Sequence, residues 1–429
     1  MIDALGPHGD GLATLDGRSV FVPGAAPGDR VRVRPEVARG PAVEARLLEL
    51  LEPGAGRAEP PCPHFGPCGG CTHQHLTEPV YRAWKRDRLV TALARQGLDT
   101  EVVADLVPGM PGARRRAVFG ARRGGDRVFL GFNEAGSHRI VDLAACTVLD
   151  PAIVALLAPL RTLLADLLVD GEPADIAVTR LEDGLDVCLE LDRPLPLAGL
   201  ERASAFAESQ DLARLSWRRP PGKGGGPPEP PTPIAWRRAG RLTVAGVPVS
   251  PPPGGFIQAT ETAEAALADV VVDTVGRALG PGGGRVADLF CGIGAFALRL
   301  AALDRVRVAA VDGQAEALDA LGAAVDAAGI PDRVVRARRD LARDPLSHGE
   351  LAGFDAVVFD PPRAGAKEQA GEIAASPVPV VVAVSCNPAS FARDARLLVD
   401  GGYRLESALP VDQFLWSPHL EVAAVFRRA

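Results

Sequence analysis

The chain has 429 residues, of which 47% are hydrophobic and 24% are charged, an ordinary composition for a globular protein of two or three domains. Its formal net charge of −7 argues against a polyanionic partner, but basic residues gather at 114–139 and 214–241. Such local patches can follow phosphates, so charge leaves nucleic-acid binding open. Because no apolar run could span a membrane and no signal-peptide pattern opens the chain, we expect a cytoplasmic protein without membrane contact.

Short apolar segments separated by glycine and proline fill the beginning of the chain. They lie at residues 11–15, 19–23, 30–34 and 42–48. Regularly spaced short strands with turn signals between them are typical of small all-β units. We therefore predict a small OB-like β-barrel over residues 1–54.

A cysteine cluster follows. Three of the seven cysteines, Cys62, Cys68 and Cys71, are spaced C-x5-C-x2-C in a loop rich in glycine and proline. An odd number of cysteines in a cytoplasmic chain argues against a disulfide framework. With Cys146 as a fourth ligand, the thiolates suit zinc or a [4Fe–4S] cluster. Zinc sites more often pair two short hooks, so the pattern favours the cluster. Three nearby histidines keep zinc open: His64, His73 and His75.

Residues 55–247 are predicted to form a central α+β domain. Its expected elements are two helices, at 80–95 and 153–168, and two strands, near 175–180 and 185–191. The first helix is a candidate for packing on the C-terminal domain. The segment from Arg218 to Pro233 is basic and rich in proline and glycine, and we predict a mobile loop there.

Strands and helices alternate in the C-terminal domain, residues 248–429. This alternation predicts a doubly wound, mostly parallel sheet with helices on its faces. The final two strands have no helix between them, so we expect that pair to be antiparallel. The predicted strands are 284–290, 306–311, 334–337, 354–360, 378–384, 403–409 and 420–426, and the helices are 295–303, 315–328 and 390–399.

A glycine-rich turn follows the first of these strands. Gly292 and Gly294 belong to a G-x-G-x-x-A loop, and Asp312 ends the next strand, where a carboxylate can bind ribose hydroxyls. This pattern fits a nicotinamide cofactor or S-adenosylmethionine. Asp288 favours the second, because a carboxylate there would repel a pyrophosphate and can face the cationic end of S-adenosylmethionine.

Two further motifs lie at the carboxyl ends of later strands, where open α/β sheets bind their ligands. Asp360-Pro-Pro-Arg363 forms a rigid rim that can hold a planar base. Cys386 follows an apolar strand, and the Asn387-Pro388 turn exposes its thiol. A thiol beside such a cofactor predicts an enzyme with a covalent step.

Together with Gly255-Phe-Ile-Gln258 and His419-Leu-Glu421, these motifs resemble the class I S-adenosylmethionine-dependent RNA uracil-5-methyltransferases. Within that family, the four cysteines make the chain similar to the iron–sulfur 23S rRNA 5-methyluridine branch. The resemblance covers nearly the whole chain. It implies a Rossmann-like methyltransferase domain with a seven-stranded sheet and, at the N-terminus, a TRAM domain that grips RNA. The chain departs from the family at Asp312, where glutamate is more usual.

The resemblance also implies residue roles. Cys386 would add to C6 of uracil and make C5 nucleophilic towards the methyl group. Glu421 would then remove the C5 proton, while Asp360 would hold the uracil edge. The implied cluster ligands are Cys62, Cys68, Cys71 and Cys146. The implied contacts to S-adenosylmethionine are Gln258, Asp288, Phe290, Gly292, Gly294, Asp312, Asp340 and Asp360.

Four functions are open at this point. The leading hypothesis is 5-methylation of a uridine in 23S rRNA by a monomeric enzyme, and the closest alternative is the same reaction on tRNA. An NAD-dependent oxidoreductase is disfavoured by Asp288 and would have no use for Cys386. A non-catalytic iron–sulfur RNA-binding protein would leave the C-terminal motifs unexplained.

Overall fold

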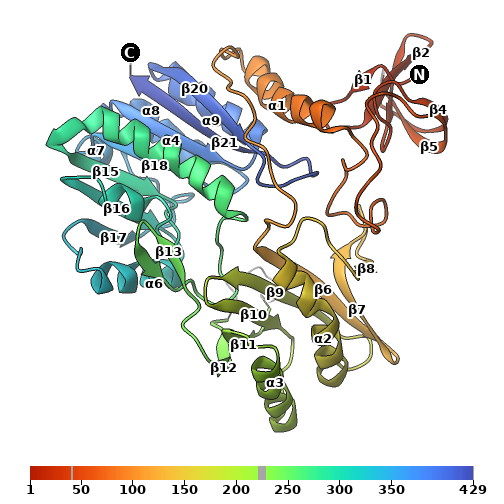
Figure 1. Ribbon diagram of the computed structural model, residues 1–429. Helices are drawn as coiled ribbons and strands as arrows, with labels where there is room; N and C mark the ends of the chain where they lie inside the picture. The colour runs from red at the N-terminus through yellow and green to blue at the C-terminus, as the bar shows by residue number, and fades with distance from the viewer. Residues whose placement is uncertain (40–41, 221–228, 429) are drawn as a thin grey trace.

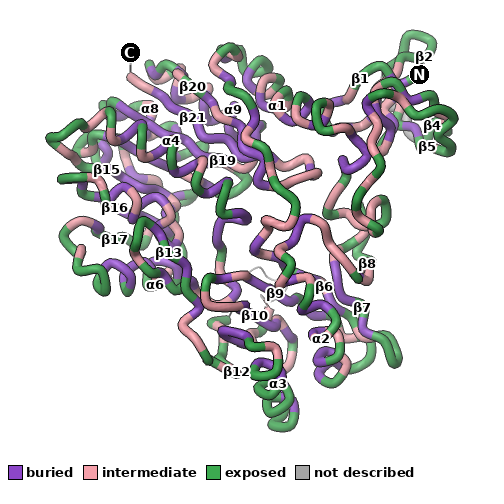
Figure 2. The backbone as a smooth tube through the Cα atoms, viewed as in Figure 1, coloured by how far each residue is buried: buried purple, intermediate pink, exposed green. Residues whose placement is uncertain are grey.

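The computed structural model describes residues 1–39, 42–220 and 229–428. Its strands form three larger sheets and one hairpin. In Figure 1 the three sheets make three lobes, and helix α1 (Glu78–Arg95) lies between the N-terminal and the C-terminal lobes. Buried residues follow the strands and the inner faces of the helices, whereas the outer turns are exposed (Figure 2). None of the described helices is long and apolar enough to cross a membrane.

The N-terminal sheet has five strands in the order β1-β2-β3-β5-β4. The four predicted strands are present, and the two-residue strand β1 precedes them. Backbone hydrogen bonds tie the start of β1 to the segment before β4: Ile2 donates to Asp29 O at 2.8 Å, and Gly28 donates to Ile2 O at 2.8 Å. The strands are β1 (Ala4–Leu5), β2 (Gly11–Leu15), β3 (Arg18–Val22), β4 (Arg30–Arg39) and β5 (Ala42–Glu52).

The central sheet has seven strands in the order β12-β11-β10-β9-β6-β7-β8. Strands β10 and β11 are parallel, and the other neighbours are antiparallel. Leucines at helical spacing bury one face of α2 in the core of this sheet. The elements are β6 (Arg116–Gly124), β7 (Arg127–Asn133), β8 (Ile140–Asp142), α2 (Pro151–Leu167), β9 (Pro173–Leu181), β10 (Gly184–Glu190), α3 (Leu197–Ser209), β11 (Arg214–Arg218) and β12 (Thr232–Trp236).

The prediction of a loop over residues 218–233 was wrong at both ends. Arg218 is the last residue of β11, and its ion pair with Glu190 on β10 holds it in the sheet. Thr232 begins β12, which pairs with β11. Proline-rich composition concealed this strand, because an edge strand such as β12 tolerates proline. Residues 221–228, the greater part of the predicted loop, lie outside the described residues.

The C-terminal sheet has the order β17-β16-β15-β18-β19-β21-β20. Its first five strands are parallel, and the final pair, β20 and β21, is antiparallel, as predicted. Strand β21 is also antiparallel to β19, a pairing that was not predicted. Val380 and Val382 face one hydrophobic core while Val381 and Ala383 face the other, so both sides of the sheet are buried. The strands are β15 (Gly284–Leu289), β16 (Val306–Asp312), β17 (Val334–Arg338), β18 (Ala356–Phe359), β19 (Val380–Ser385), β20 (Tyr403–Val411) and β21 (Glu421–Arg428).

The helices of this domain differ from the predicted ones. Helices α4, α7 and α8 were not predicted, and α5 is shorter than the expected 295–303 because the glycine-rich loop occupies the residues before it. The helices are α4 (Glu261–Leu279), α5 (Ala297–Ala301), α6 (Ala315–Ala327), α7 (His348–Leu351), α8 (Lys367–Ala375) and α9 (Pro388–Asp400).

The hairpin of β13 (Leu242–Val244) and β14 (Val247–Val249) bears on the domain limits. Leu242, Val244 and Val249 pack in one of the cores of the C-terminal sheet. The limit proposed after residue 247 would cut this hairpin. A division before residue 242 keeps the hairpin with the core that it contacts.

Helix α1 packs on the C-terminal lobe. Its Leu89 and Leu93 share a core with Phe391 of α9. On the same helix Lys85 is fully buried, forms an ion pair with Asp412 and donates to Phe414 O at 2.9 Å. The connection between β20 and β21 is therefore anchored to α1.

Candidate active site

Two antiparallel strands bring the predicted nucleophile and the predicted base together. Strand β19 ends at Ser385, which pairs with Val422 of β21. The next step of this register places Cys386 beside Glu421. Strand β18 runs parallel to β19 and ends just before Asp360. Three residues that are distant in sequence therefore meet at one edge of the sheet.

The turn that carries Cys386 is tied to the proline-rich rim. Asn387 caps α9 by accepting from Ala389 N–H at 3.1 Å, and its amide donates to Arg363 O at 3.2 Å. The Ser390 hydroxyl donates to the same carbonyl at 3.0 Å. Both motifs are thus fixed relative to each other.

The glycine-rich loop folds back on the end of β16. The Phe290 and Cys291 N–H groups donate to Val311 O at 2.8 and 3.2 Å, and Phe290 has a left-handed backbone with φ of 61°. Asp312 accepts from Gly292 N–H at 2.8 Å. A Cβ at Gly294 would approach Leu321 to 2.5 Å, whereas one at Gly292 would meet only open space. The loop is close-packed at Gly294 and open at Gly292, where a ligand can lie.

Asp288 is a buried carboxylate without a partner. It is fully buried, and neither carboxylate oxygen accepts a hydrogen bond from the described residues. Burial and the nearby Asp360 raise its pKa well above the usual range; the Ala297 N–H lies near enough to oppose this rise in part but does not meet the distance and angle of a hydrogen bond. An orphaned buried carboxylate is costly unless a ligand satisfies it. The cationic amino group of S-adenosylmethionine has the charge and the donors to do so.

Asp340 lies close to the end of β16. It follows β17, is exposed, and its carboxylate is 3.6 Å from the Arg343 guanidinium. Its Cα is nevertheless 3.7 Å from the position that a Cβ on Gly313 would take, directly after Asp312. The structure thus places it next to Gly313, beside the predicted cofactor residue Asp312, without burying it.

A hydrogen-bonded chain of side chains links the cofactor residues to the base. The Gln258 amide donates to Asp360 at 3.0 Å. Gln413, which the sequence did not single out, donates to Gln258 at 2.8 Å and to Glu421 at 3.2 Å. A polar Asp412-Gln413 pair directly after the apolar strand β20 was the only signal that could have revealed it.

The acidic residues perturb one another and the thiol. Loss of solvent raises the pKa of Asp360, and burial together with Asp360 raises that of Glu421. Burial, Glu421 and Asp360 raise the pKa of the half-buried Cys386 thiol to about 11. The resting site therefore holds protons on groups that are usually ionised or easily ionised.

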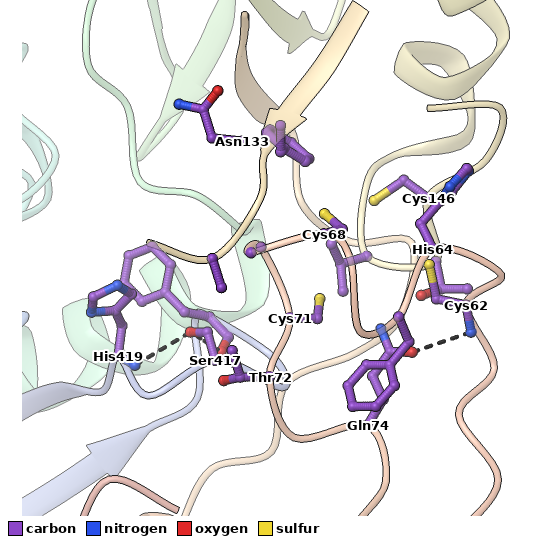
Figure 3. A pocket seen from close by; sticks show the side chains of 18 of the residues that line it. Cys62, His64, Cys68, Cys71, Thr72, Gln74, Asn133, Cys146, Ser417 and His419 are labelled. Carbon is purple, nitrogen blue, oxygen red and sulfur yellow. Dashed lines mark hydrogen bonds between the residues drawn. The ribbon is translucent and has the colours of Figure 1, made fainter. Parts of the chain in front are cut away.

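A cavity of about 660 Å³ connects Cys386 to the cysteine loop. Cys386 and Arg363 line it on the catalytic side, and all four predicted cluster ligands line it on the other. Figure 3 shows Cys62, Cys68, Cys71 and Cys146 gathered on one side of this space, with Ser417 and His419 on the other.

The four cysteines are free thiols, and a fit to the predicted cluster can be examined directly. Burial and, to a smaller degree, the three other cysteines raise the pKa of Cys71 to about 12, so the thiols lie within electrostatic reach of one another. Four thiols on one cavity wall are a suitable donor set for iron or zinc. Within the described residues, however, no three His, Cys, Asp or Glu side chains stand close enough together to hold a metal ion.

Two of the three histidines of the zinc alternative are hydrogen-bonded elsewhere, and the third lies away from the cavity. The two ring nitrogens of His73 contact the Thr72 hydroxyl at 2.8 Å and His8 O at 3.1 Å. His64 lines the cavity, but its Nε2 accepts from Ala144 N–H at 3.1 Å. His75 does not line the cavity. Thiols are therefore the better candidates for all four ligands.

Cationic side chains surround the cavity. Arg114 and Arg363 line it, and Arg88 lies close enough to Arg363 to lower its own pKa. None of these three arginines forms an ion pair with a carboxylate among the described residues. Burial and the same arginines lower the pKa of His419 to about 4, so this residue is neutral at pH 7. Unpaired guanidinium groups around a cavity suit a phosphate-bearing ligand.

Comparison with known proteins identifies the family. The model for tRNA (uracil-5-)-methyltransferases matches residues 255–429, and the TRAM domain model matches residues 1–48. A protein of Agrobacterium fabrum named as an uncharacterized RNA methyltransferase is 42% identical over 447 residues, which cover 100% of this chain and 98% of the relative. The chain belongs to the RNA uracil-5-methyltransferase family.

Two other similarities agree with this membership. The 23S rRNA (uracil(1939)-C(5))-methyltransferase RlmD of Halomonas elongata is 36% identical, over 98% of this chain and 87% of the relative. The crystal structure of Pyrococcus abyssi tRNA (uracil-54, C5)-methyltransferase with S-adenosyl-L-homocysteine has a TM-score of 0.74 and covers 99% of both chains. At 23% identity this neighbour shows the fold alone.

The predicted family, fold class and enzyme type are thereby confirmed. This RNA uracil-5-methyltransferase has a class I methyltransferase fold, uses S-adenosylmethionine and acts on RNA, with a TRAM domain at its N-terminus. Family membership excludes the NAD-dependent oxidoreductase and the non-catalytic RNA-binding protein. The partnerless Asp288 and the open space above Gly292 fit S-adenosylmethionine at the predicted place.

Proposed function

We propose that this enzyme methylates C5 of a uridine in 23S rRNA, with Cys386 as nucleophile and Glu421 as base. The observation that carries the proposal is the β19–β21 register, which sets the thiol beside a buried carboxylate at the end of the cavity. The RlmD relative, similar over nearly the full length of both chains, supports 23S rRNA as the substrate.

In the proposed reaction the Cys386 thiol first loses its proton to solvent. The thiolate then adds to C6 of uracil, and the electrons of the C5–C6 double bond move into an enolate. S-adenosylmethionine supplies the methyl group that C5 takes up. Glu421 then accepts the proton of C5, the C6–S bond breaks, and the double bond returns. The raised pKa of Glu421 suits a base that must receive a proton near neutral pH.

The thiol requires help to react, because its pKa in the free enzyme is about 11. One of the two carboxylates that raise it, Asp360, lies near Asp288, the proposed partner of the cofactor's amino group. A positively charged methyl donor there opposes their field and lowers the pKa of Cys386. Binding of the cofactor would therefore prepare the nucleophile.

Each predicted cofactor residue has a proposed contact. Asp288 would bind the amino group, and Asp312 would accept from ribose hydroxyls with the lone pairs that Gly292 N–H and Gln314 N–H leave free. The remaining contacts would come from Gln258, Phe290, Gly292, Gly294, Asp340 and Asp360.

We also propose that Cys62, Cys68, Cys71 and Cys146 hold a [4Fe–4S] cluster, because four thiols line one cavity wall. Methyl transfer needs no electron from such a group, so its proposed role is to order the loop against RNA. Metal analysis of protein purified without air tests this. Iron near four per chain supports the cluster; stoichiometric zinc without iron contradicts it.

The substrate is tested by nucleoside mass spectrometry of 23S rRNA and tRNA, purified separately from a deletion strain and its parent. Loss of 5-methyluridine from 23S rRNA alone supports the proposal. Loss from tRNA alone keeps the chemistry and moves the substrate. Unchanged 5-methyluridine in both contradicts the assignment.

The covalent step is tested with RNA that carries 5-fluorouridine at the target. Fluorine cannot leave C5 as a proton does, so we expect a stable adduct on Cys386, detected by mass spectrometry of its peptide. Absence of any adduct, with S-adenosylmethionine and the RNA identified above, would remove the thiol mechanism.

A further inference from the structure

Gln413 occupies the centre of the hydrogen-bonded chain between the two proposed catalytic carboxyls. Its side chain is buried. Its carbonyl oxygen accepts from Ala259 N–H at 3.1 Å. Its amide nitrogen donates to Gln258 Oε1 at 2.8 Å and to Glu421 Oε1 at 3.2 Å.

The orientation of this amide follows from its partners. A backbone N–H can only donate, so the oxygen of Gln413 must face Ala259 and its NH2 group must face Glu421 and Gln258. Gln258 then accepts with its oxygen, which leaves its own NH2 to donate to Asp360 at 3.0 Å. One backbone N–H thereby sets the direction of two side-chain amides.

The backbone of Gln413 is itself held from outside the catalytic domain. The preceding residue, Asp412, pairs with the fully buried Lys85 of α1 and accepts from the Tyr81 hydroxyl at 2.8 Å. Asp412 N–H also donates to Val107 O at 2.9 Å. The amide is therefore presented by a rigid connection rather than by a free loop.

We propose that Gln413 is a positioning residue for methyl transfer: it holds Glu421 as a hydrogen-bond acceptor and fixes the Gln258 amide towards Asp360. This inference rests on the proposed function and deepens it. Among the described residues, Gln413 is the only hydrogen-bond donor to the Glu421 carboxylate. With Oε1 held, the second oxygen of Glu421 is left for the C5 proton.

The consequence concerns the step after methyl transfer. A base that can rotate away from C5 loses the alignment on which proton removal depends, and misplacement of about 1 Å can cost on the order of 100-fold in rate. Without Gln413, the covalent Cys386 adduct should form and then persist.

The first test replaces Gln413 with methionine, which keeps the length and removes all three hydrogen bonds. We expect single-turnover release of RNA containing 5-methyluridine to fall on the order of 10- to 100-fold, with accumulation of the methylated Cys386–RNA adduct. The matched control is Gln369→Met, because Gln369 is equally buried but bonds only to Leu346, remote from the site. Equal rates and equal adduct levels in the two variants would overturn the proposal.

A second variant, Gln413→Glu, covers the case in which Gln413→Met does not fold. It keeps the shape and places a third carboxyl beside Glu421, whose charged surroundings are Asp360, Lys85 and Cys386. The added negative charge should move the pH profile of adduct breakdown to higher pH, a readout that packing alone would not change. An unmoved profile contradicts the proposal. If the wild-type enzyme forms no covalent adduct with 5-fluorouridine RNA, the proposed function itself is contradicted.

Discussion

The two walls of the main cavity are constructed differently. The catalytic wall stands on the ends of β19 and β21, and its acidic groups are held by side-chain amides, Gln258 on Asp360 and Gln413 on Glu421. The cysteine wall, with Cys62, Cys68 and Cys71 on a loop without helix or strand, brings thiols to one space without joining them in a metal site. The first wall is organised before anything binds, whereas the second has the donors but depends on what they bind for its final geometry.

The largest expected effect is the loss of activity when the Cys386 thiol is removed from the catalytic wall. Cys386→Ala should lower single-turnover methylation by at least about 10⁴-fold, because covalent catalysis is lost, while the affinity for S-adenosylmethionine stays within about twofold. Cys188→Ala, a buried cysteine in the central sheet, is the matched control. Substantial activity of Cys386→Ala would refute the covalent mechanism.

The ion pair between Lys85 and Asp412 anchors the connection that carries Gln413, and its contribution to stability can be measured. Lys85→Met leaves the buried Asp412 carboxylate unpaired and should lower the free energy of unfolding by about 3–5 kcal/mol in urea titrations. The double variant Lys85→Met/Asp412→Leu should recover most of that loss. Arg82→Met on the same helix removes only an exposed pair with Glu78 and should cost about 0.5 kcal/mol or less. If Lys85→Met behaved like Arg82→Met, α1 would not anchor the site.

Preorganisation for a cation predicts opposite effects on binding and stability at Asp288. Asp288→Asn should weaken S-adenosylmethionine binding about 10- to 100-fold, or about 1.4–2.7 kcal/mol, in calorimetry. Since the folded pKa of Asp288 is raised, the wild-type carboxylate costs stability once the pH exceeds its unfolded pKa of about 3.9. The cofactor-free variant should therefore have the higher Tm at pH 7, and this advantage should disappear near pH 4. A lower Tm at pH 7 would contradict the argument.

The smallest expected effect distinguishes the thiols of the two walls. Glu421 raises the pKa of Cys386, so Glu421→Gln should lower it and speed alkylation by iodoacetamide at pH 9 about three- to tenfold. The effect should vanish at pH 6, where the raised pKa of Glu421 keeps its carboxyl protonated. Cys71 is perturbed by burial and by other cysteines, and its alkylation rate should not change. Equal acceleration of both thiols would indicate a general opening of the protein.

Sequence patterns anticipated the features that depend on neighbours along the chain. The alternation of strands and helices predicted the C-terminal sheet, and the antiparallel final pair followed from the missing helix between its strands. The glycine-rich loop was found because its turn requires Gly294. These features are local, and short-range patterns report them.

The features that were missed arise from contacts between distant segments. Gln413 is one polar residue in a turn, and only the fold shows that it lies between Gln258 and Glu421. The cavity that joins the cysteine loop to Cys386 is likewise invisible in the spacing of the cysteines. Strand β12 was concealed by proline, because pairing with β11 rather than propensity determines it.

The strand order of the C-terminal sheet has a consequence for biosynthesis. Strand β21 is the last described strand along the chain, yet it is inserted between β19 and β20. A nascent chain that has reached only β20 carries the proposed nucleophile Cys386 and the glycine-rich loop, but Glu421, the proposed base, has not yet been incorporated. Under the proposed mechanism an unfinished enzyme near the translating ribosome could not complete methyl transfer, because a covalent adduct on Cys386 would have no base to resolve it until β21 enters the sheet.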